Sequence, residues 1–320
     1  MSVKKCKNGG VCLMLRLRIN RKRVLSGTYS VVVYVLLIGL SFVFLYPFLH
    51  MFSTSIKSYD DLTDITVKWF AKNVQLSNWA VAFESLNYVR SFGNSLLVSL
   101  VATLGHILSC SFIAYGFARF KFPLKRLLFG ILVLAIIVPL PAIIVPQYRM
   151  FSGYGVVNRQ NILDYTAILV PTFFGFGLRG CLFIYLFRQT FIKMPPVLEE
   201  AAAIDGCNPF KTFFRIIMPS AGSVVLVVFV LSMVWHWNDY YEPNLYISGE
   251  QWFLLPQLLP GMKAAIDALS GNAMDPDAVR TYNDAVAMAG TALAALPMLI
   301  MFFAVRNKFM QSIERTGIVE

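Results

Sequence analysis

Six stretches of the chain are almost entirely apolar over about 20 residues, the length that an α-helix needs to cross the hydrocarbon layer of a membrane. They lie near residues 30–51, 92–117, 127–148, 166–187, 221–241 and 285–305. The third contains Pro139, Pro141 and Pro146, and each proline removes a backbone donor, so we expect its second half to be kinked or unwound. The pattern predicts an all-α membrane protein with six transmembrane helices.

The charged residues between these stretches predict how the spans are oriented. The first 29 residues contain eight Lys or Arg and no acid, and the segment 118–126 contains four basic residues and no acid, whereas 242–284 is acidic. Because cytoplasmic loops are enriched in Lys and Arg, we expect both termini on the cytoplasmic side of the cell membrane. The first apolar stretch is longer than the apolar core of a secretory signal, so we predict an uncleaved helix.

Composition narrows the class of protein further. Hydrophobic residues make up 57% of the 320 residues and charged residues only 14%, whereas soluble domains average about 25% charged residues. A water-soluble or disordered chain is therefore excluded. The net charge of +11 is explained by the Lys and Arg of the cytoplasmic segments, which set the orientation of the spans, and does not indicate binding of nucleic acid. The five cysteines form no CxxC pair and no histidine cluster accompanies them, so we expect no metal and no cofactor.

The same pattern divides the chain into three parts. These are a basic cytoplasmic tail at 1–29, a transmembrane domain at 30–305 and a cytoplasmic tail at 306–320. No Gly/Ser linker or internal repeat separates a second domain. Either Met1 or Met14 could begin the protein, because the first residues add little to the basic segment that follows.

Between the fourth and fifth predicted spans, residues 195–219 form a segment that a simple membrane hairpin does not need. Glu199 and Glu200 follow two prolines, and acids are favourable at the start of a helix. Gly206 can end that helix, because glycine accepts the left-handed conformation of a C-terminal cap. We therefore expect a short helix followed by a polar turn at Asp205 and Gly206.

A second short helix follows the turn. Asn208 can cap it, and Pro209 suits its first position. We expect Pro219 to end it before the fifth span. The side chains with the spacing of one apolar helical face are Phe210, Phe213, Phe214 and Ile217.

This segment resembles the EAA loop of the permease subunits of ABC importers. The match is Glu-Ala-Ala-x-x-Asp-Gly at 200–206, nine further residues, and Ile-x-Met-Pro at 216–219. The family favours Leu where Met218 stands and Ala where Cys207 stands. The runs AYGFARFKFP, LFRQTF and WHWND are similar to the carbohydrate-uptake branch, in particular to the second membrane subunit of maltose-type transporters. The resemblance extends from about residue 85 onward.

The resemblance implies a type I importer permease core at about 85–305 and a set of partners. These are a homologous second permease, two ATPase subunits, an extracytoplasmic solute-binding protein and the surrounding membrane lipid. An ATPase subunit is expected to grip the EAA loop and to drive alternating access through it. The sequence contains no GxxxxGK[ST] phosphate loop, so ATP hydrolysis is expected on a separate chain and this subunit is not an enzyme. The residues expected to couple to the ATPase are Glu199, Glu200, Ala201, Ala202, Asp205, Gly206, Ile216 and Pro219.

A few polar residues lie inside the predicted spans. Placing a polar side chain in the membrane is unfavourable in free energy, so these residues mark candidate functional sites. Arg179, Trp237, Asn238 and Asp239 are candidates for a translocation path or gate. Arg179 could line the path or pair with Asp239, or it could lie at a helix break in the glycine-rich run GFGLRG. The aromatic residues of the fifth span could bind sugar or anchor the helix at the interface. We interpret His106 as a packed histidine.

Other functions remain open at this point. An ABC permease for a non-sugar solute keeps the same fold, and a secondary transporter or channel would also use polar residues within six spans. The spacing of the EAA loop favours the ABC importer over the latter. An intramembrane enzyme is disfavoured because HExxH, GxSG and paired-Asp protease patterns are absent. The sequence does not identify the transported sugar.

Overall fold

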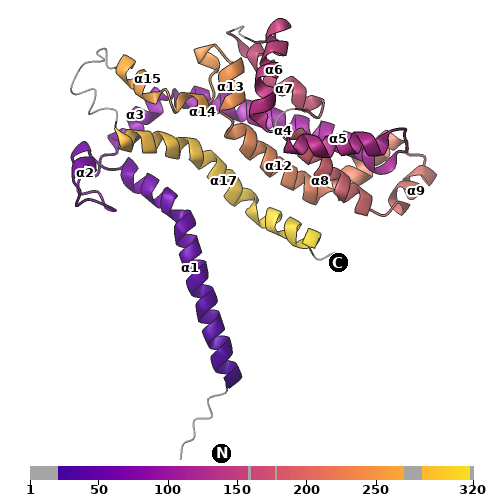
Figure 1. Cartoon of the computed structure of the whole chain (residues 1–320), viewed down its shortest axis with the longest axis horizontal. Helices are drawn as coiled ribbons and strands as arrows, with labels where there is room; N and C mark the ends of the chain where they lie inside the picture. Colours follow the sequence, from indigo (N-terminus) through magenta and orange to yellow (C-terminus); the bar gives the residue numbers. More distant parts are fainter. Residues whose placement is uncertain (1–20, 158–159, 177–178, 270–282, 318–320) are drawn as a thin grey trace, which may run out of the picture. The chain divides into compact units, whose positions relative to one another are not determined.

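The computed structural model describes residues 21–157, 160–176, 179–269 and 283–317 (Figure 1). Within these ranges the regular elements are helices, and β-structure amounts to one isolated bridge. The predicted all-α fold is therefore confirmed.

Among the described residues, three helices are long and apolar enough to cross a membrane, namely Tyr29–Ser55, Tyr88–Arg119 and Asp284–Gln311. They contain the first, second and sixth predicted spans. Two bent pairs of shorter helices would also qualify if each pair formed one span, which gives up to five spans by length and composition. Six spans and their orientation therefore stay predictions.

The chain divides into two compact units, residues 1–51 and 52–320. Most of α1 (Arg21–Ser55) belongs to the first unit, and its apolar side chains between residues 29 and 50 are exposed around the helix. A helix that is apolar on every side is stable as a membrane span and would not be soluble alone. This property agrees with a first membrane span, and that the helix is uncleaved stays a prediction.

The core of the second unit is built on α4 (Tyr88–Arg119), which packs along α7 (Thr166–Phe173), α8 (Gly180–Lys193) and α12 (Gly222–Trp237) (Figure 1). Near the C-terminal end of α4, phenylalanines interlock with aliphatic side chains from several helices. The largest fully buried side chains of this cluster are Phe183, Phe187, Phe191, Phe213 and Ile217. These side chains join the EAA loop to α8 and α4.

A second apolar cluster lies at the opposite ends of α4 and α12. There α17 (Asp284–Gly317) packs against α12 and α3 (Ser77–Ser85), and α15 (Met262–Leu269) also contacts α3. Trp237 is buried in this cluster. The two clusters brace α12 at both ends.

The third and fourth predicted spans are both broken. The predicted kink in the third is confirmed, because α5 (Lys125–Ile137) and α6 (Leu140–Gly153) meet at a sharp bend beside Pro139. The fourth predicted span, 166–187, is divided, because α7 ends at Phe173 and α8 begins only at Gly180, as expected from the alternative of a helix break in GFGLRG. The fifth span is shorter than predicted and ends at Trp237.

The remaining elements are short. They are α2 (Tyr59–Thr63), the 3₁₀ helices η1 (Ile162–Tyr165) and η3 (Glu250–Trp252), α9 (Val197–Ile204), α10 (Pro209–Thr212), the π-helical turn η2 (Phe213–Ile217), α11 (Met218–Ser220), α13 (Tyr241–Tyr246) and α14 (Leu255–Leu258).

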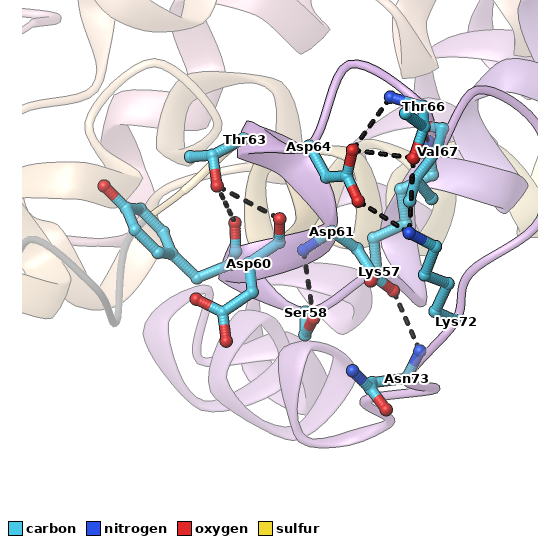
Figure 2. Close-up of polar contacts among 11 residues, drawn as sticks. Lys57, Ser58, Asp60, Asp61, Thr63, Asp64, Thr66, Val67, Lys72 and Asn73 are labelled. Carbon is cyan, nitrogen blue, oxygen red and sulfur yellow. Dashed lines mark hydrogen bonds and ion pairs between the residues drawn. The ribbon is translucent and has the colours of Figure 1, made fainter.

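The loop between α2 and α3 is ordered by its own polar contacts (Figure 2). The Lys72 ammonium lies 2.6 Å from a carboxylate oxygen of Asp64, whose other oxygen accepts hydrogen bonds from the backbone and hydroxyl of Thr66. These bonds, those of Lys72 first, hold the pKa of Asp64 well below its usual range. The buried Lys57 ammonium donates to the carbonyls of Val67 and Lys68. The segment between the first two predicted spans therefore holds short helices and a fixed polar turn.

Candidate functional site

The EAA loop (residues 195–219) contains two short helices joined by a tight turn, in agreement with the sequence pattern. The first helix, α9, follows Pro196 and carries Glu199 and Glu200 in its first turn. Acids at this position interact favourably with the helix dipole. The helix is therefore stabilised locally at its N-terminus.

The C-terminus of α9 is closed by a Schellman motif. The Gly206 N–H donates to the carbonyl of Ala203 at 3.1 Å, and the Cys207 N–H donates to that of Ala202 at 2.9 Å. Gly206 has a φ of 76°, in the left-handed region. A Cβ atom on Gly206 would meet nothing within 4 Å, so glycine is required here for its backbone conformation and not for space.

The second helix begins as predicted, because the Asn208 side chain accepts a hydrogen bond from the Lys211 N–H at 2.8 Å. The expectation of a single apolar face is only half correct. Phe213 and Ile217 are fully buried, whereas Phe210 and Phe214 are exposed and stack on each other at 6.4 Å. The helix widens into the π-turn η2 at this point, which changes the directions of the side chains from those of a regular α-helix.

The predicted end of this helix at Pro219 is slightly wrong. Pro219 lies in the first turn of α11, which continues to Ser220, and the chain bends by 79° before α12. A proline is tolerated there because a first-turn N–H needs no partner within the helix.

Arg119, at the C-terminus of α4, ties the EAA loop to the transmembrane core. Its Nε donates to Oε1 of Glu199 at 2.7 Å, and its terminal nitrogen donates to the carbonyl of Met194 at 2.9 Å. The two ionised side chains are only 15% and 22% exposed. Sequence reasoning counted Arg119 only as a topology charge. No local sequence pattern indicates this contact, because Glu199 lies 80 positions further along the chain.

The remaining predicted coupling residues differ in exposure. Ala202 is buried, Ile216 is half-buried and Pro219 is exposed. Six of the exposed residues of α9, the turn and the start of α10 form what we call the outer EAA surface: Val197, Glu200, Ala201, Ile204, Asp205 and Phe210. It combines large apolar side chains with two acids, and Ile204 is 87% exposed. Such a mixture on a rigid turn is suited to binding another protein.

The polar residues predicted for a translocation path lie in different environments. Trp237 is buried, and its indole N–H donates to the carbonyl of Ala294 in α17 at 2.9 Å. Asp239 is also buried and accepts a hydrogen bond from the Tyr241 N–H, while Asn238 is exposed. Trp237 therefore joins two helices of the core. The role of all three in transport stays a prediction.

Arg179 lies at the break between α7 and α8. It precedes α8 with a φ of 66°, and its guanidinium carbon is 5.3 Å from the centre of the Trp235 ring. Among the described residues no salt bridge joins Arg179 to Asp239. The geometry therefore agrees with a broken helix at this point and not with the alternative of an ion pair.

Two glycines approach each other closely across the break between α7 and α8. Gly175, two residues after the end of α7, has a φ of 76°, and its carbonyl oxygen would lie 2.3 Å from a Cβ atom on Gly180. Because the obstacle is backbone and not a flexible side chain, a larger residue at position 180 must shift the chain.

We expect Gly180→Ala to lower the free energy of unfolding by about 1–3 kcal/mol, the usual cost of overpacking. Thermal unfolding of the purified protein in detergent measures this effect. Gly93→Ala on the exposed side of α4 is the matched control, because its Cβ would meet nothing within 4 Å, and there alanine should be neutral or stabilising. Equal melting temperatures for the two variants would contradict the close contact.

His106 and His236 are buried and stacked on each other, with ring centres 5.3 Å apart. Phe183 packs edge-on against His106 at 5.1 Å. His106 is thus a packed histidine, as interpreted. In the described part of the chain, no group of three or more His, Cys, Asp or Glu residues could hold a metal ion.

Residues 107–316 match the family model described as the binding-protein-dependent transport system inner membrane component. The chain belongs to this family. It is therefore the membrane permease subunit of an ABC importer, and the ATPase is a separate subunit. The matched range includes the whole EAA loop, α8, α12 and most of α17.

Two curated relatives illustrate the family. The permease is 29% identical over 264 residues to the melibiose/raffinose/stachyose import permease protein MelC of Bacillus subtilis, covering 82% of this chain and 87% of MelC. It is also 29% identical over 221 residues to the sn-glycerol-3-phosphate transport system permease protein UgpE of Pectobacterium atrosepticum, covering 69% and 70% of the two chains.

The fold of the permease is similar to a solved structure of a bacterial ABC transporter involved in the import of the acidic polysaccharide alginate. The two chains superpose with a TM-score of 0.70 at 19% identity, over 88% of this chain and 96% of the other. This similarity extends beyond the range of the family model and supports the importer permease fold for most of the chain.

Proposed function

We propose that this permease imports a sugar or oligosaccharide and that its EAA loop transmits the movement of an ATPase to the membrane helices. The observation that carries the coupling role is the turn at Gly206, where an exposed surface is held rigidly by the Schellman motif and by Arg119. A surface that must transmit a push needs this kind of rigid attachment. The proposed substrate class is supported by relatives such as MelC and by the similarity to the sugar-uptake branch.

The proposed assembly places this chain beside a homologous permease, two ATPase subunits and an extracytoplasmic binding protein. We propose six spans with both termini in the cytoplasm, because this arrangement puts segments 1–29 and 118–126 on the side where basic residues are favoured. In this orientation the EAA loop also faces the cytoplasm, where ATP is available. The residues proposed to lie near the path or gate are Arg179, Trp237, Asn238 and Asp239.

Reconstituted vesicles provide the test. The complete transporter with its binding protein should take up an oligosaccharide when ATP is present, and uptake should stop when the ATPase is inactivated. Calorimetry on the co-purified binding protein identifies the ligand. Uptake that persists with an inactive ATPase would contradict the coupling role and favour a secondary transporter.

A non-sugar solute is the second candidate, because the similarity to UgpE is as high in identity as that to MelC. A binding protein that takes a phosphate ester and no sugar would exclude the proposed substrate class. It would leave the fold and the coupling role intact.

If the outer EAA surface binds the ATPase, substitutions on it should weaken that binding. We expect Ile204→Asp to reduce the recovery of the ATPase with the purified permease by at least about 30-fold, since central apolar contacts in interfaces are often worth 2 kcal/mol or more. Asp205→Lys should also abolish uptake. Because both residues are exposed, the amount of permease in the membrane should not change. The matched control is Ile65→Asp, an equally exposed isoleucine in the loop after α2. Normal ATPase recovery with Ile204→Asp would overturn the assignment of this surface.

A further inference from the structure

Three basic side chains converge on a pocket at the start of α5. The pocket has a volume of about 380 Å³, and the residues that line it are Lys121, Phe122, Leu124, Lys125 and Arg126. None of these residues is an acid, and the described salt bridges involve none of them. The cations are therefore close together without a neutralising partner in the described part of the chain.

The charge around this pocket is increased by a neighbouring helix. Arg188 of α8 lies with its guanidinium carbon 3.8 Å from the centre of the Phe129 ring, one helical turn beyond Lys125. Desolvation, and then the positive charge of Arg188, lower the pKa of Lys125. The Lys125 side chain is held in place because it donates to the carbonyl of Phe120 at 2.9 Å.

The first turn of α5 adds to the excess of positive charge around the pocket. Leu124 precedes the helix with a φ of 60° and provides no side-chain cap, and the first turn contains Lys125 and Arg126 but no acid. Basic residues next to the positive end of the helix dipole are unfavourable. An anion bound in the pocket would offset both the dipole and the side-chain charges.

The surface next to the pocket is apolar and continuous along α5. No residue of α5 is buried, and the large apolar side chains that it exposes are Leu127, Leu128, Ile131, Leu134 and Ile137. Leu127, Ile131 and Leu134 follow each other at helical spacing on one face. A cationic pocket at the end of such a stripe is complementary to an anionic phospholipid, whose headgroup would lie in the pocket and whose acyl chain would lie along the stripe.

We propose that the pocket of Lys121, Lys125 and Arg126 binds the phosphate headgroup of an anionic phospholipid, with an acyl chain along the exposed face of α5. The inference rests on the proposed membrane placement of the permease. The cations bind the phosphate, and the apolar stripe distinguishes a lipid from a soluble phosphate. Lipid bound here would fix the junction between α4 and α5, which also contains Arg119.

Native mass spectrometry of the full permease in detergent tests the proposal. The probes are phosphatidylglycerol, phosphatidylcholine of the same chain length, and inorganic phosphate. We expect the wild type to retain phosphatidylglycerol at least about tenfold more than phosphatidylcholine, and phosphate in millimolar excess not to displace it. Each basic residue near an anionic lipid surface contributes about a fivefold preference.

The variant for this test is Lys121→Gln/Arg126→Gln, which keeps the Lys125 bond to Phe120. It should reduce the preference by at least about tenfold, whereas Lys68→Gln/Lys263→Gln, with the same change in charge at two exposed positions elsewhere, should retain it. If the double variant is not monodisperse, Lys121→Gln alone should lower the preference about fivefold.

Three outcomes would overturn the lipid site. They are an unchanged preference in the double variant, equal retention of phosphatidylcholine by the wild type, and displacement by inorganic phosphate, which would indicate a soluble anion. Because binding is measured without ATP or substrate, its failure is separable from a failure of the transport function. A permease that binds the lipid but transports no sugar would contradict only the proposed transport function.

Discussion

Replacing Gly206 by proline is expected to reduce ATP-driven uptake by about 100-fold or more. Proline fixes φ near −65°, whereas Gly206 has a φ of 76° and also donates its N–H to Ala203. The Schellman motif cannot form with proline at this position. A cost of about 3 kcal/mol for this local conformation corresponds to a roughly 100-fold smaller population of the competent turn.

A graded series at the same position separates backbone conformation from side-chain size. Space around Gly206 is open, so Gly206→Asn should retain most of the uptake, because asparagine tolerates the left-handed region. Gly206→Ala should lose about five- to 30-fold, from a cost of about 1–2 kcal/mol. Uptake by reconstituted vesicles and the amount of permease in the membrane are the two measurements. If Gly206→Pro transports normally, or if Asn is as inactive as Pro, the turn is not what couples the ATPase.

The turn at Gly206 can be predicted from the sequence for a physical reason. Capping residues such as Asn208 and Gly206 act through bonds to their own backbone neighbours, so a few adjacent residues determine the local structure. The EAA helices could therefore be predicted within a residue or two. The exposed Phe210 and Phe214 could not, because a π-turn depends on the packing of Phe213 and Ile217 against distant helices.

The membrane spans could likewise be predicted only as far as local sequence determines their structure. Hydropathy predicted α4 and α17 well, because each is a long apolar segment without a break. Over 166–187 hydropathy indicated a span but not the break within it, where the chain turns at Gly175. Apolar composition indicates that a segment can lie in lipid, and it does not indicate whether the helix continues. The glycine-rich run was the better guide there, and it correctly marked the environment of Arg179.

Arg119 was missed because its importance comes from a contact across 80 positions of the sequence. No local pattern relates the end of α4 to the start of α9. Only the packing of α4 along α8 brings the guanidinium to Glu199 and to the Met194 carbonyl. The resemblance to a family predicted which loop is functional, and the structure identifies the side chain that connects it to the membrane helices.

Reversing the charge of Arg119 is expected to uncouple ATP hydrolysis from transport. In Arg119→Glu, the carbonyl of Met194 loses its donor and Glu199 faces a second acid in a mostly buried position. Losing hydrogen bonds to charged groups costs about 1.5–3 kcal/mol, so uptake should fall by at least about tenfold. ATPase activity should fall less, because the ATPase itself is unchanged.

The reciprocal exchange tests this contact directly. Arg119→Glu/Glu199→Arg should restore more than half of the lost uptake, because the ion pair can re-form with its charges reversed. Arg119→Lys should be intermediate, since lysine keeps the charge but lacks the two planar donors that contact Glu199 and Met194 together. Lys193→Glu, an exposed charge reversal beside Met194, is the matched control and should transport nearly normally. The deciding measurement is the number of substrate molecules imported per ATP hydrolysed. A double exchange no better than Arg119→Glu alone, or an unchanged ratio in every variant, would show that this contact only stabilises the fold and does not transmit the movement of the ATPase.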